Sequence, residues 1–449
     1  MLRSSTTYEA VAASYLLWPL SGMAFNRVEG NVCSETSAGR SALFATTQSP
    51  QQPKIALVHE WLYTYAGAEK VLEVMLATFP EADVFCLIDR MPERHRAGLR
   101  GKKTHTTFLQ KIPFVQHLYR WLLPLMPFAI EQFDLSSYDI VISNSHAVAK
   151  GVSTSARQLH ICYCYTPMRY AWDLQQQYLQ ESGIARGFRS ILARYFLHRL
   201  RIWDHSSAQH VDHFLACSHY ISRRIHKAYR RSATVLYPNV DTESFVIGSG
   251  HRADFYMCAS RMVPYKKMHL IVEAFARMPD KRLIVIGQGP QFKRIKKLAT
   301  PNVTLLGYQP FSVLLHHLQR ARAFIFVAEE DFGIAPLEAQ ACGTPVLAFD
   351  RGGTSETVIA GVTGLHFHEQ TAEAIMDVIE RFEVLERKFD PQTISANAQR
   401  FSAARFSREF RSFVVDHWAQ QAEATMESVS ARESRGDAAP SSNPLLTGT

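Results

Sequence analysis

The feature that most constrains the fold is an alternation of short apolar runs with amphipathic segments, which occurs twice along the chain. The apolar runs of the first half are residues 55–60, 82–88, 138–145, 160–165 and 213–218. Those of the second half are residues 255–260, 282–287, 303–307, 323–327 and 345–349. Helical patterns lie between runs, at residues 68–78, 269–278, 311–319 and 372–381. Buried strands that alternate with helices are typical of parallel sheets covered on both faces.

The length of the chain divides this alternation into two domains, because 449 residues are too many for one hydrophobic core. We therefore expect an α/β protein with two doubly wound, Rossmann-like domains, residues 53–247 and 251–400. Their facing strand ends would enclose a cleft. A C-terminal helix is predicted over residues 401–420, where its position after the second sheet would let it cross back onto the first domain.

Both ends of the chain are expected to lie outside these domains. Residues 421–449 are rich in Ser, Arg, Glu, Pro and Gly, and this composition predicts a disordered tail. Residues 1–52 are predicted to be a disordered extension or the result of a start codon assigned too early. The apolar stretch at residues 10–25 is interrupted by Pro19 and is too short to span a membrane. A signal peptide is a third alternative for this region.

Charge and cysteine content limit the partners and the compartment. The chain has 49 Lys and Arg against 41 Asp and Glu, a formal charge of +8 that suits phosphorylated ligands or an anionic membrane face. It has no long run of Lys and Arg, so no nucleic-acid partner is predicted. The 7 cysteines are odd in number and scattered, which favours free thiols in a reducing cytoplasm.

The segment over residues 326–356 carries the most chemical information. Glu330 and Glu338 are separated by seven residues across a turn that opens a helix. Gly333 lets the backbone approach a ligand, and Pro336 fits the first helical turn. A strand followed by a glycine turn and a helix N-terminus is a ready anion site, formed here by Gly333, Ile334 and Ala335. Carboxylates beside such a site accept hydrogen bonds from sugar hydroxyls, so the segment predicts binding of a nucleotide-sugar.

Further motifs in the second half resemble a known family. They are Ser260-Arg261 with Lys266, Gly287-Gln288-Gly289-Pro290, Gly307, Gly343-Thr344-Pro345-Val346, and Gly352-Gly353-Thr354-Ser355-Glu356. Their order and spacing, together with the Glu330 and Glu338 pair, resemble the retaining glycosyltransferase family 4, which has the GT-B fold. The resemblance covers roughly residues 53–413.

The resemblance implies roles for individual residues. Arg261 and Lys266 would neutralise the departing nucleotide diphosphate. Such fixed cations stabilise the transition state more than the ground state, because the charge on the diphosphate grows as the bond breaks. Glu330 would face the donor sugar, and no protein nucleophile is assigned. Glu338 would hold the ribose hydroxyls. Gly287 and Gly289 would complete the donor site.

The expected donor is a GDP- or UDP-linked sugar, with no cofactor and no metal. The D-x-D pair that holds a cation in other glycosyltransferases does not occur in the chain. Arg261 and Lys266 would then balance the diphosphate without a metal.

The first half supplies the candidate acceptor side. Gly67, which opens a helix, is where the family usually has two glycines close to the donor phosphate. The segment over residues 160–173 resembles bacterial mannosyltransferases that build O-antigen and exopolysaccharide. Tyr165 stands where that subgroup usually has His, while His160 is interpreted as a structural residue. Further acceptor-side candidates are Arg169, Tyr170 and Asp173, although an ordinary packed helix entry would explain them equally well.

Two basic, apolar stretches suggest a membrane-bound acceptor. Residues 108–128 are rich in Phe and Leu, and residues 187–201 combine four arginines with apolar side chains and no acid. Such segments can lie on an anionic bilayer. The alternative is that both pack as long helices in the core. The resemblance favours a cytoplasmic protein on the inner membrane face, with a polyprenyl-diphosphate-linked saccharide as acceptor.

The sequence as a whole predicts a retaining, metal-independent hexosyltransferase in cell-surface polysaccharide synthesis, with mannose from GDP-mannose as the favoured donor. Two alternatives stay open. One is a non-hydrolysing sugar-nucleotide epimerase, which would share the architecture. The other is a nucleotide-sugar-binding protein that has lost transfer activity, with Tyr165 and Ala66 as the signs of that loss.

Overall fold

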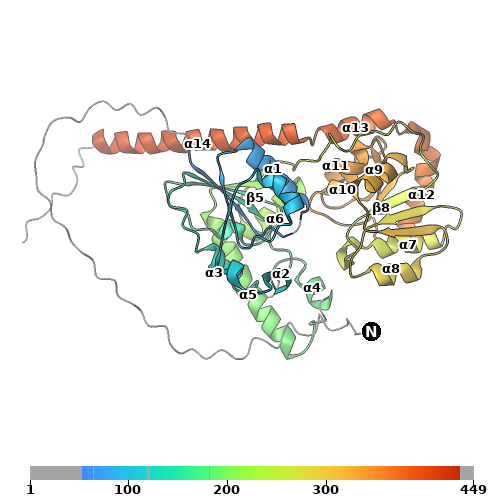
Figure 1. The fold of residues 1–449 in the computed structure, drawn as a ribbon, viewed down its shortest axis with the longest axis horizontal. Helices are drawn as coiled ribbons and strands as arrows, with labels where there is room; N and C mark the ends of the chain where they lie inside the picture. The colour runs from blue at the N-terminus through green and yellow to red at the C-terminus, as the bar shows by residue number, and fades with distance from the viewer. Residues whose placement is uncertain (1–52, 64, 119–121, 182, 435–449) are drawn as a thin grey trace, which may run out of the picture.

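The computed structural model describes residues 53–434 except residues 64, 119–121 and 182. Two α/β domains lie side by side (Figure 1), and we call them the N-terminal domain (residues 53–247) and the C-terminal domain (residues 251–400). Each contains one parallel sheet, with strand order β3-β2-β1-β4-β5-β6-β7 in the first and β10-β9-β8-β11-β12-β13 in the second. The predicted fold class, two Rossmann-like parallel sheets, is confirmed.

The N-terminal domain places helices on both faces of its sheet. Its strands are β1 (Ile55–His59), β2 (Asp83–Cys86), β3 (Thr104–Thr106), β4 (Ile140–Ser145), β5 (Leu159–Cys164), β6 (His213–Ala216) and β7 (Thr234–Val235). Its helices are α1 (Gly67–Thr78), α2 (Val115–Leu118), α3 (Met126–Ile130), α4 (Gln175–Glu181), α5 (Phe188–Ser207) and α6 (His219–Tyr229), with a short 3-10 turn η4 (Ala149–Gly151) after β4. Alternate residues of β1 enter separate hydrophobic clusters on the two faces, as expected for a strand covered on both sides.

The C-terminal domain repeats this architecture with shorter connections. Its strands are β8 (Tyr256–Ala259), β9 (Leu283–Ile286), β10 (Val303–Gly307), β11 (Phe324–Phe326), β12 (Val346–Phe349) and β13 (Gly364–Phe367). Its helices are α7 (Met268–Ala276), α8 (Phe292–Leu298), α9 (Phe311–Arg320), α10 (Ile334–Ala341), α11 (Thr354–Thr357), α12 (Ala372–Leu385) and α13 (Pro391–Gln399), with a 3-10 turn η6 (Pro264–Lys266) after β8. The strands β3, β7 and β13 were not predicted, because they are short and carry polar residues or glycine.

The last helix, α14 (Ala403–Ser434), returns to the N-terminal domain and packs on α1 (Figure 1). Phe406, Phe410 and Val414 are buried at a spacing of four residues, which forms one apolar stripe. The Phe410 ring lies 5.7 Å from that of Phe79, and the Ser407 hydroxyl lies 2.8 Å from that of Thr78. This helix therefore ties the two domains together.

The predicted disordered tail is wrong for residues 421–434, which continue α14. Their polar composition suggested disorder, but the run also contains Ala, Glu and Met, which are good helix formers. Propagating an existing helix costs far less than starting one, so α14 extends beyond its packed stripe. Residues 435–449 and the predicted N-terminal extension lie outside the described residues.

Candidate active site

The loop that follows β11, residues 327–333, forms the centre of the site, and we call it the donor loop. It ends at Gly333, whose φ of +88° is left-handed and begins α10. Pro336 is buried in the first turn of α10, as predicted. The donor loop packs tightly on Gly352, where a Cβ would lie 2.2 Å from the Glu330 carbonyl oxygen. The glycines of the Gly352-Gly353 pair therefore set the position of Glu330.

Lys266 and Glu330 come together as an ion pair, and both side chains are mostly shielded from solvent. Lys266 ends η6, directly after β8, and lies over the rings of Tyr265 and Phe326. Arg261 precedes this turn and is exposed, so its side chain is available to a ligand. The two predicted cations therefore occupy one connection at the carboxyl end of β8, and Lys266 touches the donor loop. Within the described residues, no group of three or more His, Cys, Asp or Glu side chains is placed to hold a metal ion.

Gly287 and Gly289 have a packing function that the sequence motif did not indicate. A Cβ on Gly287 would lie 1.9 Å from the Ser260 carbonyl oxygen, and one on Gly289 would lie 2.5 Å from that of Met262. Both glycines have positive φ, at +134° and +157°. They allow the loop after β9 to pack closely against the backbone of Ser260 and Met262, on either side of Arg261.

Glu338 faces the N-terminal domain rather than open solvent. Its carboxylate accepts a hydrogen bond from Lys70 of α1 at 3.2 Å. Beside this ion pair, a Cβ on Gly67 would lie 2.8 Å from Ile334 Cδ1. The first turn of α1 thus meets the first turn of α10 across the domain boundary. Lys70 was not identified from the sequence, because nothing in its own segment marks it as a partner of Glu338.

Tyr165 lies against the Gly67 turn. Its hydroxyl donates to the Ala68 carbonyl oxygen at 3.3 Å, and burial raises the pKa of its phenol well above the ordinary value. Its ring is T-shaped to both Tyr163 and His146. Tyr165 therefore places an uncharged side chain beside the Gly67 turn, which lies against Ile334 of α10. His160, in contrast, is buried within the sheet, where its Nε2 contacts the Ser143 hydroxyl and burial lowers its pKa to about 4.

Arg169 and Asp173 belong to the loop after β5, residues 165–174, which we call the Arg169 loop. Arg169 pairs with Asp331 of the donor loop. Asp173 pairs with Arg224 of α6 at 2.5 Å, and Arg224 also reaches Asp331 at 3.4 Å. Burial raises the pKa of Asp331, while the two guanidinium groups act in the opposite direction. This network joins the acceptor-side candidates to the residue that follows Glu330.

Tyr170 is placed differently from Arg169 and Asp173. It packs against the hydrophobic cluster beneath the Arg169 loop, with its ring 6.2 Å from that of Tyr178. Its hydroxyl is buried and makes no hydrogen bond among the described residues. The network described above does not include it.

His146, which follows β4, lies at this edge of the sheet and was not predicted. Its ring stands 5.0 Å from Trp61 in a T-shaped contact, and burial lowers its pKa. Its backbone N–H donates to the buried carboxylate of Glu60 at 3.0 Å. A histidine thus follows β4, and Tyr165 follows the neighbouring strand β5. The sequence feature that could have identified His146 is its position directly after a buried strand, where the site residues of such folds lie.

Glu356 forms another contact between the domains that sequence reasoning missed. Its two carboxylate oxygens accept from the backbone N–H groups of His219 and Tyr220 at 2.8 and 2.7 Å, and the Tyr237 hydroxyl donates to it at 3.1 Å. A negative charge at the N-terminus of α6 is favourable because the helix dipole is positive there. The Gly352-Gly353 segment is therefore fastened to the opposite domain.

Comparison with known proteins finds a family similarity in the C-terminal domain. Residues 239–401 match the family described as Glycosyl transferases group 1. This segment contains Arg261, Lys266, Glu330 and Glu338, whereas Gly67, the candidate for contact with the donor phosphate, lies outside the matched region.

Two mycobacterial relatives show the similarity in more detail. The GDP-mannose-dependent alpha-(1-6)-phosphatidylinositol monomannoside mannosyltransferase of Mycolicibacterium smegmatis is 30% identical over 192 residues, which cover 36% of this chain and 50% of the relative. The D-inositol 3-phosphate glycosyltransferase of the same organism is 32% identical over 184 residues, covering 35% and 42%. The chain therefore spans about half the length of these relatives or less.

Solved structures resemble the chain over most of its length. Sucrose-phosphate synthase from Thermosynechococcus elongatus has a TM-score of 0.63 at 17% identity, covering 82% of this chain and 100% of that one. HepE from Anabaena, in complex with UDP and glucose, has a TM-score of 0.58 at 18% identity, covering 81% and 100%. At such identities the likeness shows the fold alone, and it confirms the predicted GT-B arrangement.

Proposed function

We propose that this protein is a retaining, metal-independent glycosyltransferase that moves a hexose from a nucleotide-sugar to a glycan or lipid-linked saccharide during cell-surface polysaccharide synthesis. The observation that carries the proposal is the grouping of Lys266, Glu330 and Glu338 around the N-terminus of α10, opposite Gly67. A diphosphate there would contact both a helix N-terminus and fixed cations. The carboxylates would accept hydrogen bonds from the hydroxyls of the sugar and the ribose.

The charges of this site suit departure of a nucleotide diphosphate. As the bond between the anomeric carbon and the diphosphate oxygen breaks, negative charge grows on that oxygen, and Arg261 and Lys266 stabilise it. The acceptor hydroxyl attacks from the same face, and the departing phosphate takes its proton, so the configuration is retained. Glu330 positions the sugar by accepting hydrogen bonds from its hydroxyls and is not assigned as the nucleophile. In the free protein Glu330 holds Lys266, and the incoming diphosphate competes for that cation.

The favoured donor is GDP-mannose, because the name of one mycobacterial relative specifies that donor. A UDP-linked sugar is the second candidate, supported by the UDP and glucose bound to the structurally similar HepE. Tyr165 stands where similar mannosyltransferases usually have His. Another group must therefore make the contact with the sugar hydroxyls that this His would make. The contact of Tyr165 with the α1 turn makes its side chain part of the wall near that sugar.

Nucleotide release from a panel of GDP- and UDP-linked sugars, with lipid-linked saccharides as acceptors and EDTA present, tests the proposal directly. We expect release to depend on the acceptor, to be greatest with GDP-mannose and to persist in EDTA, with the product keeping the donor's anomeric configuration. Loss of all activity on chelation would overturn the metal-independent mechanism. An epimerised donor formed without acceptor would identify an epimerase. Donor binding by calorimetry without transfer would identify a binding protein.

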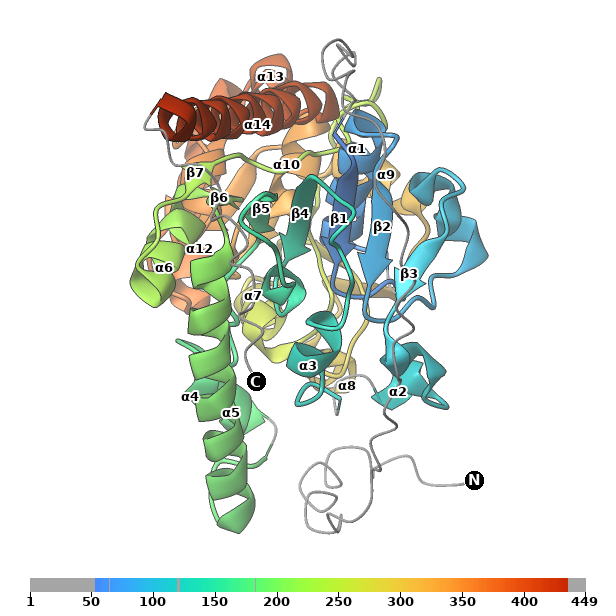
Figure 2. The same ribbon diagram turned by 90° about the vertical axis from the view of Figure 1, so that its left-hand side faces the viewer.

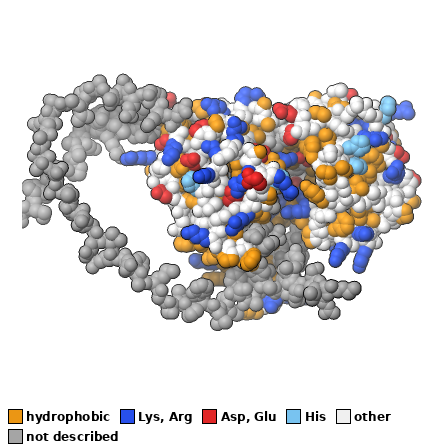
Figure 3. All heavy atoms as spheres, viewed as in Figure 1, with side chains coloured by type: hydrophobic (Ala, Val, Ile, Leu, Met, Phe, Trp, Pro, Cys, Tyr) orange, Lys and Arg blue, Asp and Glu red, His pale blue; other side chains and the backbone are white. Residues whose placement is uncertain are grey.

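Exposed apolar side chains on the N-terminal domain support the proposed contact with a membrane surface. On α5, Phe188, Ile191, Tyr195 and Ile202 are exposed, so the core-packing alternative is wrong for these residues. Residues 108–128 are mixed: Leu109, Val115 and Met126 are buried, whereas Phe114 and Phe128 are exposed. Figure 2 shows α5 projecting from the sheet at the end opposite α14. Apolar side chains are also visible along the lower edge of this domain in Figure 3.

Through this apolar surface, the protein would bind to the surface of a membrane without spanning the bilayer. None of the described helices is both long and apolar enough to traverse a bilayer. Arg189 and Arg199 are exposed on α5, near the apolar side chains, and exposed cations are attracted to anionic lipids by about 1 kcal/mol each. We propose that the N-terminal domain docks on the inner membrane face, where a polyprenyl-diphosphate-linked acceptor would be presented.

Replacing Phe188 and Ile191 together by Asp is expected to weaken sedimentation with phosphatidylglycerol vesicles at least roughly tenfold, because two apolar side chains would lose their burial in lipid. The matched control is Val384→Asp, which changes a side chain that is 85% exposed on the C-terminal domain. Equal vesicle binding by the double variant and the control would contradict this docking surface. Transfer to a short soluble acceptor should be unaffected in both.

A further inference from the structure

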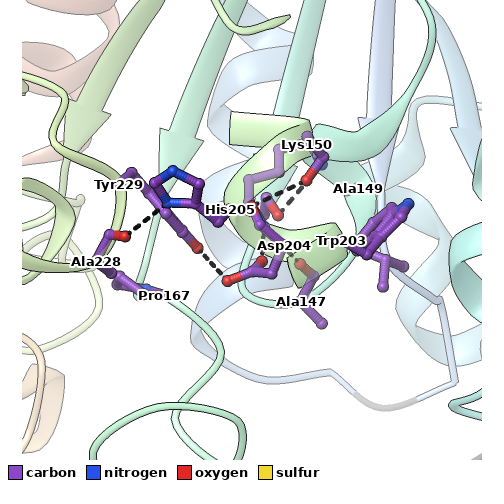
Figure 4. A network of polar contacts seen from close by, with 12 residues as sticks. Ala147, Ala149, Lys150, Pro167, Trp203, Asp204, His205, Ala228 and Tyr229 are labelled. Carbon is purple, nitrogen blue, oxygen red and sulfur yellow. Dashed lines mark hydrogen bonds and ion pairs between the residues drawn. The ribbon is translucent and has the colours of Figure 1, made fainter. Parts of the chain in front are cut away.

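The N-terminal domain contains a fully buried ion pair that the proposed chemistry does not use. Lys150 of η4 and Asp204 of α5 pair with side chains that are 2% and 0% exposed (Figure 4). Although burial by itself lowers the pKa of Lys150, the neighbouring Asp204 raises that pKa above the ordinary value. Removing two charges from water is costly, and a buried pair is weak evidence of stabilisation. Its partners are therefore the guide to what it does.

Asp204 is the acceptor for donors from three separate segments. Lys150 donates to Oδ1, whereas the Trp172 indole N–H and the Tyr229 hydroxyl donate to Oδ2 at 2.7 and 2.8 Å. Lys150 also donates to the Ala147 carbonyl oxygen at 3.0 Å. The carboxylate thus joins α5 to the turn after β4, to the end of α6 and to the Arg169 loop. Hydrogen bonds to a charged acceptor are strong and directional, so each donor is held closely.

Trp172 is the donor that leads toward the site. It lies in the Arg169 loop, directly before Asp173 and three residues after Arg169. On its far side, this loop pairs with the C-terminal domain through Arg169 and Asp331. A second contact from α5 supports the loop, because Arg201 donates to the Ala171 carbonyl oxygen. The loop is therefore held between a buried carboxylate of its own domain and the loop that carries Glu330.

We infer that Asp204 is a positioning residue for transfer, which fixes Trp172 and thereby sets Arg169 and Asp173 against the donor loop. The inference rests on the proposed function, since Arg169 and Asp173 are its acceptor-side residues. Asp204 itself touches no substrate. Lys150 balances its charge and holds the carboxylate oriented, with Oδ1 toward η4 and Oδ2 free for Trp172 and Tyr229.

Two matched substitutions separate this role from simple stabilisation. Trp172→Phe and Tyr229→Phe each remove one donor to the same Oδ2 atom, but only Trp172 belongs to the Arg169 loop. We expect Trp172→Phe to raise the KM for the acceptor at least fivefold and to lower kcat/KM at least tenfold. Tyr229→Phe should change both by less than twofold. Equal effects of the two variants on transfer, or no effect of Trp172→Phe, would overturn the inference.

A second measurement does not depend on activity. Amide hydrogen exchange over residues 165–174 is expected to accelerate at least tenfold in Trp172→Phe and to stay near the wild-type rate in Tyr229→Phe. If the wild-type protein transfers no sugar from any donor, the proposed function fails while this exchange result can still hold. Unchanged exchange in Trp172→Phe would refute the positioning role even in an active enzyme.

Replacing the whole pair offers a third variant that should fold. In Lys150→Met with Asp204→Leu, apolar side chains of similar size take the place of both charges, a change that buried pairs often tolerate. We expect a cooperative unfolding transition near that of the wild type together with a loss of transfer at least as large as in Trp172→Phe. A stable double variant with wild-type transfer would contradict the inference.

Discussion

Lys266→Met is expected to lower the kcat for transfer by roughly 10²–10³-fold, the usual loss when one preorganised charge contact to a developing anion is removed. Lys266 pairs with Glu330 of the donor loop, and in the proposed mechanism its charge is most useful when the bond to the diphosphate is partly broken. The effect should fall on kcat more than on the donor KM, because a contact made mainly in the transition state does not strengthen ground-state binding. Initial rates with varied donor concentration measure both constants.

Two controls make this result interpretable. Lys293→Met removes an exposed cation on α8 of the same domain and should leave kcat within twofold of wild type. Thermal unfolding of Lys266→Met should stay close to wild type, because the Glu330 carboxylate left behind is partly exposed and can be solvated. A folded Lys266→Met enzyme with an unchanged kcat would remove Lys266 from the mechanism and leave Arg261 as the remaining cation of this segment.

Much of the fold could be predicted because the strands are buried on both faces. In such strands nearly every position is apolar, as in β12 and in β1 up to His59, and the pattern is visible without knowledge of the partner strands. The strands that were missed lie at or near sheet edges, where one face or one end is exposed. The sequence Thr-His-Thr of β3, for example, pairs only with β2 and carries no apolar signal.

The grouping of Glu330, Gly333 and Glu338 could also be predicted, because these residues lie close together in the sequence. Glu330, Gly333 and Glu338 share one connection between a strand and a helix, so local geometry brings them together. Lys266 follows β8, which is adjacent to β11 in the sheet, and the carboxyl ends of neighbouring parallel strands meet at one edge. Strand adjacency of this kind is a consequence of the doubly wound topology.

The contacts between the domains could not be predicted in the same way. Lys70 with Glu338, Arg169 with Asp331, and Glu356 with the N-terminus of α6 all depend on how two separate domains are oriented. No local pattern encodes that orientation, and a single sequence contains no covariation that would pair the residues. The buried Lys150 and Asp204 escaped notice for a related reason. Charged residues are almost never fully buried, and nothing in the sequence marks these two as a buried pair.

Glu60→Gln is expected to lower the free energy of unfolding by about 3 kcal/mol or more, although Glu60 touches no proposed substrate. The Glu60 carboxylate is 0% exposed and accepts from the Ser145 hydroxyl and from the backbone N–H groups of residues 146–149. A Gln side chain offers one carbonyl oxygen and turns an N–H₂ group toward donors. Buried N–H groups of the turn after β4 would then lack an acceptor. Urea denaturation at neutral pH measures the change.

The pH dependence gives this prediction a distinct signature. Burial by itself raises the pKa of Glu60. His146 and the N–H groups of residues 147–149 lower that pKa by more than burial raises it, so the folded-state pKa lies below 4.5. A carboxyl with a depressed pKa contributes stability above its unfolded-state value, and that contribution is lost as the pH falls through the folded-state value. The difference between wild type and Glu60→Gln should therefore be constant near neutrality and shrink below about pH 4.5.

The matched control for this experiment is Glu93→Gln, which alters a carboxylate with 92% side-chain exposure and an Arg96 partner at 3.6 Å. Exposed ion pairs contribute about 0–1 kcal/mol, so this variant should unfold nearly as the wild type does at every pH. Similar stabilities for Glu60→Gln and Glu93→Gln would mean that the turn after β4 finds other acceptors when the carboxylate is removed. Because that turn carries both His146 and Lys150, its loss of order in Glu60→Gln should also reduce transfer at temperatures where the protein remains folded.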